Sequence, residues 1–132
     1  MKIALLGHGK MGRMIERIAQ ERGHEIILTV DDKNRDGFVT EKLKQADVAI
    51  EFTMPDVAVD NYKWCMDCGV PVVSGTTGWL KQWEEVRTYV NEKKGGFFYA
   101  SNFSIGVNIF FRLNQYLAKM MNGFGDYHVF VE

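Results

Sequence analysis

Three glycines after the first apolar run constrain the fold of this chain more than any other feature. Residues 2–6 form a short apolar run, and Gly7, Gly9 and Gly12 follow with G-x-G-x-x-G spacing. Residues 10–22 then carry apolar side chains at helical spacing, and Gly23 is placed to end that helix. A strand that passes through glycines directly into a helix typically begins a unit of parallel strands joined by helices. The alternative is an ordinary strand-to-helix turn.

The rest of the chain continues the alternation of strand and helix. Strands are expected at 2–6, 25–30, 48–52, 70–74, 97–100 and 127–131. Helices are expected at 10–22, 40–45, 53–68, 79–94 and 104–121. The pattern predicts an α/β fold of the Rossmann type, with a doubly wound parallel sheet. The methionine and aromatic stripes of the helices are interpreted as core.

One helix start and the last strand carry further expectations. Thr53 is expected to cap the helix that begins near Pro55, with an acid three residues after the cap. The strand at 127–131 follows a long apolar helix and has no later element to cover it. It either pairs at the sheet edge or begins another domain. We expect a dinucleotide-binding domain at 1–104, with 105–132 as the linking helix and first strand of a second, truncated domain.

Composition excludes several classes of function. The 132 residues suffice for one core, and 46% apolar with 25% charged residues is ordinary for a globular protein. A net charge of −1 leaves no electrostatic footprint for nucleic acid or an acidic membrane. Apolar runs are too short for a membrane span, and the first run is too short for a signal peptide, so a cytoplasmic location is expected.

The cysteines and histidines predict no metal centre. Cys65 and Cys68 have the spacing of half a zinc site or a redox pair, but they precede Gly69 at the end of a predicted helix. We interpret them as reduced structural cysteines. His8, His24 and His128 are scattered and receive no catalytic role.

The glycine loop suits a pyrophosphate group. Gly7 allows the turn, Gly9 lets phosphate approach the backbone, and Gly12 lets the helix pack on the strand. The helix N-terminus offers backbone N–H groups and partial positive charge. The predicted phosphate loop is Gly7-His8-Gly9-Lys10-Met11-Gly12, and it points to a nicotinamide dinucleotide.

Asp31 ends the second strand, where such a site needs a carboxylate for the adenosine ribose. Asp32 follows, and the two carboxylates should repel a 2′-phosphate. We therefore predict NADH as the preferred cofactor. NADPH is the second candidate because Lys33 and Arg35 blunt this repulsion; Asp32 has the alternative of a solvated turn residue.

Three further loops follow the third, fourth and fifth strands, and the carboxyl ends of parallel strands share one edge of a sheet. Their residues are candidates either for turn formation or for contact with the nicotinamide and its ribose. They are Phe52 and Thr53; Gly75, Thr76 and Thr77; and Ala100, Ser101, Asn102 and Phe103.

Taken together, these loops resemble those of the 4-hydroxy-tetrahydrodipicolinate reductase family of bacterial lysine and diaminopimelate biosynthesis. The motifs are Gly9-Lys10-Met11-Gly12-Arg13, Phe52-Thr53 with Pro55, Gly75-Thr76-Thr77-Gly78, and the run from Ala100 to Asn108. The resemblance implies hydride transfer from NAD(P)H to a cyclic dicarboxylate and a homotetramer. It places the glycine loop at the pyrophosphate, Asp31 at the adenosine ribose, and the other three loops at the nicotinamide side.

The resemblance also implies what this chain lacks. The family's catalytic segment, a His-His pair with a Lys and an Asp-Ala-Pro-Ser-Gly-Thr run, would begin after Glu132, so no catalytic residue is expected within the chain. We expect cofactor binding with little turnover, and dimerisation or aggregation through the apolar helix at 105–121. Two alternatives remain: a related amino-acid or diaminopimelate dehydrogenase, and a stand-alone NAD(H)-sensing domain.

Overall fold

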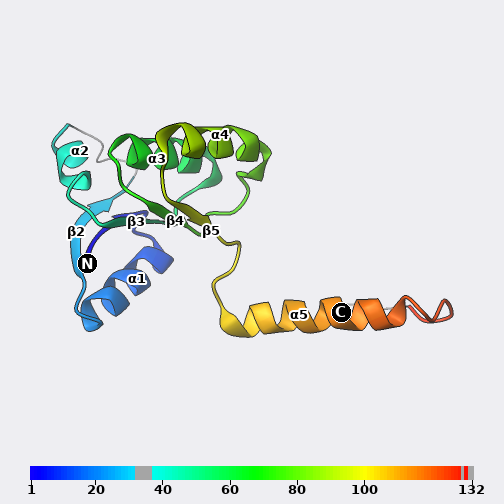
Figure 1. The fold of residues 1–132 in the computed structure, drawn as a ribbon. Helices are drawn as coiled ribbons and strands as arrows, with labels where there is room; N and C mark the ends of the chain where they lie inside the picture. The colour runs from blue at the N-terminus through cyan, green and yellow to red at the C-terminus, as the bar shows by residue number, and fades with distance from the viewer. Residues whose placement is uncertain (32–36, 129, 131–132) are drawn as a thin grey trace. The chain divides into compact units, whose positions relative to one another are not determined.

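Five parallel strands form one sheet, ordered β2-β1-β3-β4-β5. The computed structural model describes residues 1–31, 37–128 and 130 (Figure 1). The strands are β1 Lys2–Leu6, β2 Glu25–Val30, β3 Val48–Glu51, β4 Val72–Ser74 and β5 Phe97–Tyr99. The chain leaves β1 toward β2 and then returns to β3 on the other side of β1. This change of direction confirms the predicted doubly wound sheet and puts a switch point between β1 and β3.

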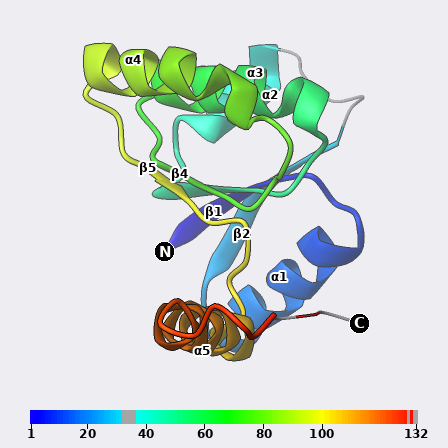
Figure 2. The same ribbon diagram turned by 90° about the vertical axis from the view of Figure 1, so that its right-hand side faces the viewer.

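Helices cover both faces of the sheet, as Figures 1 and 2 show. One face carries α1 (Lys10–Glu21). The other carries α2 (Gly37–Leu43), α3 (Pro55–Asp67) and α4 (Trp83–Lys93), and the short helix η1 (Leu80–Gln82) leads into α4. The glycine expected to end the first helix does so: Gly23 has φ +76° and its N–H bonds the carbonyl of Gln20 at 2.9 Å.

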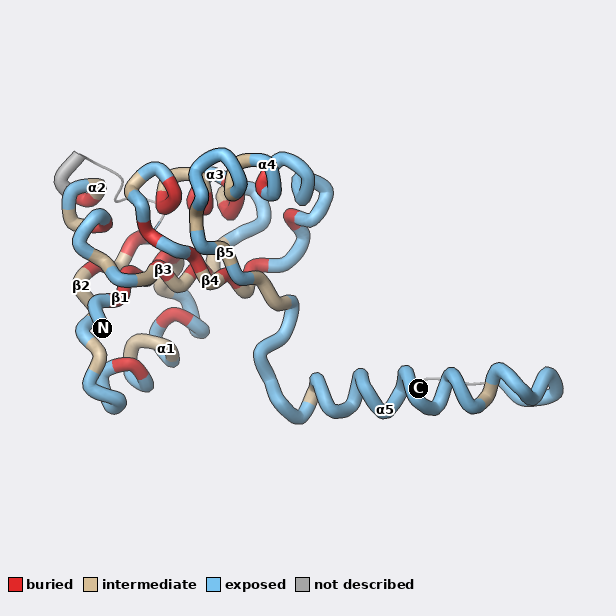
Figure 3. Tube along the Cα trace, viewed as in Figure 1, coloured by how far each residue is buried: buried red, intermediate tan, exposed pale blue. Residues whose placement is uncertain are grey.

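The core has two parts because strand side chains alternate between the faces of the sheet. Buried stretches of the chain occur along the strands and in helices on both sides of the sheet (Figure 3). In β1, Ile3 and Leu5 pack with Ala19 of α1, whereas Ala4 and Leu6 join the larger cluster beneath α2, α3 and α4. The part of the core on the α1 side of the sheet is smaller than the apolar stripe of this helix predicts. Met11, Met14 and Ile18 are exposed by 50%, 44% and 37%, so the interpretation of this whole stripe as core was wrong.

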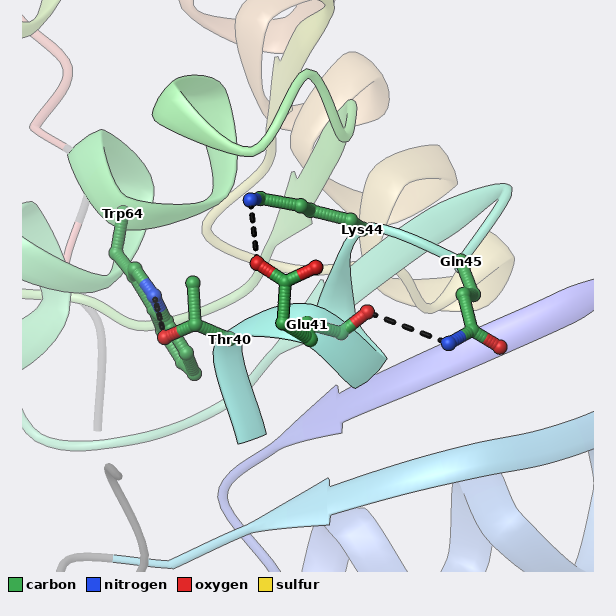
Figure 4. A network of polar contacts seen from close by, with 5 residues as sticks. All are labelled: Thr40, Glu41, Lys44, Gln45 and Trp64. Atoms are coloured by element: carbon green, nitrogen blue, oxygen red, sulfur yellow. Dashed lines mark hydrogen bonds and ion pairs between the residues drawn. The ribbon is translucent and has the colours of Figure 1, made fainter. Parts of the chain in front are cut away.

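Polar contacts attach α2 to α3 on the thicker face (Figure 4). The Trp64 indole Nε1 of α3 donates to the Thr40 hydroxyl at 3.2 Å. At the end of α2, Lys44 forms an ion pair with Glu41 at 2.6 Å, and the Gln45 side chain donates to the Glu41 carbonyl. The Trp64–Thr40 bond links α2 to α3, and the other two contacts are local to the end of α2.

The predicted Thr53 cap is wrong. Met54 occupies the cap position of α3 and makes no side-chain cap, while Pro55 begins the helix as expected. The Thr53 hydroxyl donates instead to the carboxylate of Glu51, two residues earlier. The hydroxyl oxygen accepts a hydrogen bond from the Asn61 side chain at 3.1 Å, and the helix begins one residue later than a Thr53 cap requires.

The two cysteines lie near the end of α3, Cys65 buried and Cys68 half-buried, and both are reduced. Burial raises the pKa of the Cys68 thiol above its ordinary value. Both observations agree with structural cysteines.

Residues Met1–Ser101 and Asn102–Glu132 form two separate compact units. The second contains α5 (Ile105–Met121), which Ser104 caps by accepting the Val107 N–H at 3.3 Å. Its apolar stripe is exposed, including Ile105, Leu113 and Tyr116 at 77%, 61% and 63%. Of the strand expected at 127–131, the described residues 127, 128 and 130 take no strand conformation; the others lie outside the described residues. Within the described parts of the chain, none of the helices has the length and apolarity to cross a membrane.

Candidate functional site

A hollow of about 420 Å³ opens at the carboxyl edge of the sheet, where β1, β2 and β3 end. Its position at the switch point is where open α/β sheets bind their ligands. Seven residues line it: Gly7, His8, Gly9, Asp31, Phe52, Thr53 and Met54. Its rim is held together by backbone bonds from Gly7 N–H to the Val30 carbonyl (2.8 Å) and from Phe52 N–H to the Leu6 carbonyl (2.9 Å).

The three loop glycines have different physical roles. Gly7 has φ +93°, and a Cβ there would lie 2.1 Å from the Phe52 carbonyl oxygen. A Cβ on Gly12 would lie 2.1 Å from the Gly7 carbonyl oxygen. The first turn of α1 can therefore pack this closely on the loop only because residue 12 has no side chain. A Cβ on Gly9 would meet nothing within 4 Å. Gly7 and Gly12 therefore build the turn, and Gly9 keeps space open in front of it.

The N-terminus of α1 faces this space with positive potential. Gly9 is its cap residue, makes no side-chain cap, and the first turn contains no acid. Lys10 is exposed in that turn, and the Arg13 Nε donates to the His8 carbonyl at 3.4 Å. The His8 Nε2 lies 2.7 Å from a Glu16 carboxylate oxygen, which fixes the ring beside the loop. An uncapped helix N-terminus with nearby cations is a favourable place for an anionic group.

Behind Thr53, the fully buried Glu51 accepts four hydrogen bonds. Its Oε1 receives the Thr53 N–H (3.1 Å), the Thr53 hydroxyl and the Thr76 hydroxyl (2.9 Å). Its Oε2 receives the Ser74 hydroxyl at 2.7 Å. The carboxylate thereby joins the ends of β3 and β4 to the loops that follow them.

The network continues into the core. The Tyr62 hydroxyl lies 2.7 Å from the Ser74 oxygen, and Asn61 donates to the Thr53 hydroxyl oxygen at 3.1 Å. Burial raises the pKa of Tyr62 well above its ordinary value, and Glu51 nearby raises it further. Tyr62 is therefore a neutral hydrogen-bonding group in this site.

The loop after β4 is placed beside the hollow by packing. A Cβ on Gly75 would lie 2.1 Å from a carbon of the Phe52 ring, so this glycine admits the ring that lines the hollow. Thr76 is buried, and its hydroxyl both accepts the Thr53 N–H at 2.8 Å and donates to Glu51. Thr77 is exposed.

The other predicted residues lie around or away from the hollow. Lys10, Met11 and Gly12 form the first turn of α1. Ala100 follows β5, and its N–H bonds the Ser74 carbonyl at 3.2 Å; Ser101 is exposed beside it.

Asn102 and Phe103 belong to the second unit. There the Asn102 side chain accepts the Ser104 N–H at 2.8 Å, and Phe103 is half-exposed. A second hollow, of about 570 Å³, runs along α5 from Phe103 to Leu113. One helix and the segment before it form this hollow, so nothing encloses a ligand there.

Sequence reasoning missed Met54 and Glu51. Met54 lines the hollow with a side chain that is 62% exposed. Glu51 carried a recognisable signal, a carboxylate within an apolar strand that is buried on both faces. The residues that the structure describes hold no cluster of His, Cys, Asp and Glu that could bind a metal ion.

Comparisons with solved structures establish the relatives of this fold. A dipicolinate-bound dihydrodipicolinate reductase from Paenisporosarcina sp. TG-14 has a TM-score of 0.66 at 23% identity, over 80% of this chain and 49% of that one. A mutant of a hyperthermophilic archaeal homoserine dehydrogenase in complex with NADPH has a TM-score of 0.55 at 16% identity, over 74% of this chain and 43% of that one. At such identities the likeness is one of fold.

Sequence comparison is more specific. The 4-hydroxy-tetrahydrodipicolinate reductase of Christiangramia forsetii is 46% identical over 132 residues, which is all of this chain and 54% of that protein. The Acinetobacter baylyi reductase of the same name is 30% identical over 148 aligned positions, covering 95% of this chain and 52% of that protein. The chain thus spans about half the length of these curated relatives. The family described as "Dihydrodipicolinate reductase, N-terminus" matches residues 1–103, and the chain belongs to that family.

Proposed function

We propose that this chain binds a nicotinamide dinucleotide in the hollow at the switch point, as the cofactor-binding part of a 4-hydroxy-tetrahydrodipicolinate reductase. One observation carries the proposal: Gly7 and Gly12 leave no room for a Cβ, while Gly9 faces open space before an uncapped helix N-terminus. That combination admits a pyrophosphate against the backbone. The two relatives named as this reductase support the reaction class.

In this proposal, different residues of the chain bind different parts of the cofactor. Asp31 at the end of β2 takes the adenosine ribose, and the loop from Gly7 to Gly12 takes the pyrophosphate. Phe52 and Thr53, with the loop 75–77 and residues 100–103, take the nicotinamide side. The bound reduced nicotinamide supplies the hydride. Groups for a dicarboxylate substrate belong to the half of the relatives that this chain does not match, so the chain alone binds cofactor with little turnover.

Fluorescence titration of NADH tests the proposal directly. We expect saturable enhancement of the NADH emission by the chain, with competition by ADP, because ADP shares the adenosine and pyrophosphate groups. Absence of both NADH and ADP binding would refute it.

We expect NADH to bind more tightly than NADPH, by about tenfold, or ~1.4 kcal/mol. Asp31 is exposed at the rim of the hollow and its negative charge opposes a 2′-phosphate. Asp32, Lys33 and Arg35, which entered the sequence argument, lie outside the described residues. Titration of Asp31→Asn with both cofactors checks this. The variant should bind NADH more weakly and NADPH more tightly than the unmodified chain, so the preference for NADH should shrink. Tighter NADPH binding by the unmodified chain would contradict it.

We also expect self-association through α5. Its apolar stripe is exposed over several turns, and within its own unit none of the described helices or strands packs on it. Multi-angle light scattering should show a dimer or larger species. Leu113→Glu should shift the population toward monomer because it places a charge in the stripe. Gln115→Glu adds the same charge on the other side of the helix and should leave the mass unchanged. A monodisperse monomer of the unmodified chain would rule out this association.

A further inference from the structure

Glu51 has no contact with the hollow, yet two of its hydrogen-bond donors belong to the loops that border it. Thr53 lines the hollow. Thr76 lies in the loop that follows β4, and its hydroxyl accepts the Thr53 N–H. Glu51 is itself 0% exposed, and a buried carboxylate is costly unless every oxygen is well partnered. An apolar side chain of similar size would fill the same space in the core without this cost, so we look for a specific role for the carboxylate.

The hydrogens in the network can be assigned from the carboxylate outward. A carboxylate accepts, so the Ser74 hydroxyl hydrogen goes to Oε2, and Tyr62 must then donate to Ser74. The Thr53 and Thr76 hydroxyl hydrogens both go to Oε1. The Thr76 oxygen is thus free to accept the Thr53 N–H, and the Thr53 oxygen to accept from Asn61. Each hydroxyl orientation follows from the carboxylate.

Sheet order indicates which half of the cofactor this network serves. Asp31 directly follows β2 and the glycine loop follows β1, so the proposed function assigns the adenosine and pyrophosphate groups to that side of the switch point. The remaining half of the dinucleotide then passes over the ends of β3 and β4. Glu51 and Ser74 are the last residues of those two strands.

We propose that Glu51 is a positioning residue for the nicotinamide half of the site, acting through Thr53 and Thr76. The inference rests on the proposed function. Its oxygen Oε1 fixes the Thr53 backbone and hydroxyl and the Thr76 hydroxyl together, which sets the separation of the β3 and β4 loops. Loss of the carboxylate leaves the glycine loop intact and loosens these two loops.

The test compares NADH with ADP, which has the adenosine and pyrophosphate groups only. For Glu51→Gln we expect the NADH dissociation constant to rise about tenfold, while that of ADP stays within about twofold. Thr76→Val keeps the volume of the side chain and removes the two hydrogen bonds by which the Thr76 hydroxyl joins Oε1 to the Thr53 N–H, so it should give the same selective loss. It also carries the test if Glu51→Gln does not fold. The double variant should lose no more than the larger single effect, because both changes break one linkage.

Val86→Ala is the matched control for destabilisation alone. Val86 is the buried residue of α4, is 1% exposed and belongs to the core cluster. This variant should lower the melting temperature and leave both affinities unchanged. Parallel loss of NADH and ADP binding in Glu51→Gln, additive single effects, or unchanged NADH affinity would each overturn the positioning role. If the unmodified chain binds neither NADH nor ADP, the proposed function fails and this inference with it; the other outcomes remove this inference alone.

Discussion

Replacing Gly9 by aspartate should abolish NADH binding and at the same time make the chain more stable. A Cβ at Gly9 meets no atom within 4 Å, and the backbone there has φ −73° and ψ −157°, which any residue adopts. Aspartate is a preferred N-cap residue and its charge suits the helix N-terminus. We expect a gain of about 1 kcal/mol in the free energy of unfolding, and a melting temperature higher by ~4 °C. The same carboxylate occupies the space proposed for the pyrophosphate, and we expect NADH affinity to fall at least about a hundredfold.

Gly9→Asn separates charge from size in this experiment. Asparagine caps a helix about as well as aspartate and is nearly the same shape, but it carries no charge. The NADH affinity of Gly9→Asn should be about tenfold lower than that of the unmodified chain, and higher than that of Gly9→Asp. Denaturant unfolding and NADH titration of the three chains provide both readouts. Retained NADH binding in Gly9→Asp would place the pyrophosphate elsewhere and remove the basis of the proposed site.

Much of the fold could be predicted because its signals are local. Gly23 ended the first helix as expected, and the alternation of apolar runs with helical stripes gave the five parallel strands in order. Strand ends were less certain: the expected run 70–74 begins pairing as a strand only at Val72. The apolar stripes of the helices also predicted more buried residues than the structure has. Met11 and Met14 have the spacing of a core face, but spacing cannot tell whether a neighbouring element covers that face.

The site was predictable in its backbone and less so in its side chains. Gly7, Gly9, Asp31 and Phe52 all line the hollow, because the ends of parallel strands must share one edge. The role of Thr53 depended on its partners, because its hydroxyl donates to the buried Glu51 and accepts from Asn61 of α3. These contacts depend on burial and on distances between separate elements, and neither quantity is present in a linear pattern.

Gly12→Ala should destabilise the chain, although the general rule for helices predicts the opposite. Alanine is favoured over glycine inside a helix by about 1 kcal/mol. At Gly12, however, the new Cβ would lie 2.1 Å from the Gly7 carbonyl oxygen, a backbone atom that cannot rotate away. The turn or the start of α1 must shift, and overpacking of this kind costs about 3 kcal/mol. We therefore expect a net loss of ~2 kcal/mol in the free energy of unfolding.

The same shift should also weaken NADH binding, because it moves the Gly7 carbonyl and the first turn of α1, which together shape the loop. Gly9→Ala is the matched control: it adds the same methyl group three residues earlier, where the space is open, and should change the free energy of unfolding by less than about 0.5 kcal/mol. Urea unfolding monitored by circular dichroism, with NADH titration of each variant, measures both effects. A Gly12→Ala chain as stable as Gly9→Ala, with unchanged NADH affinity, would mean that close packing of α1 on the strand is not what the third glycine provides.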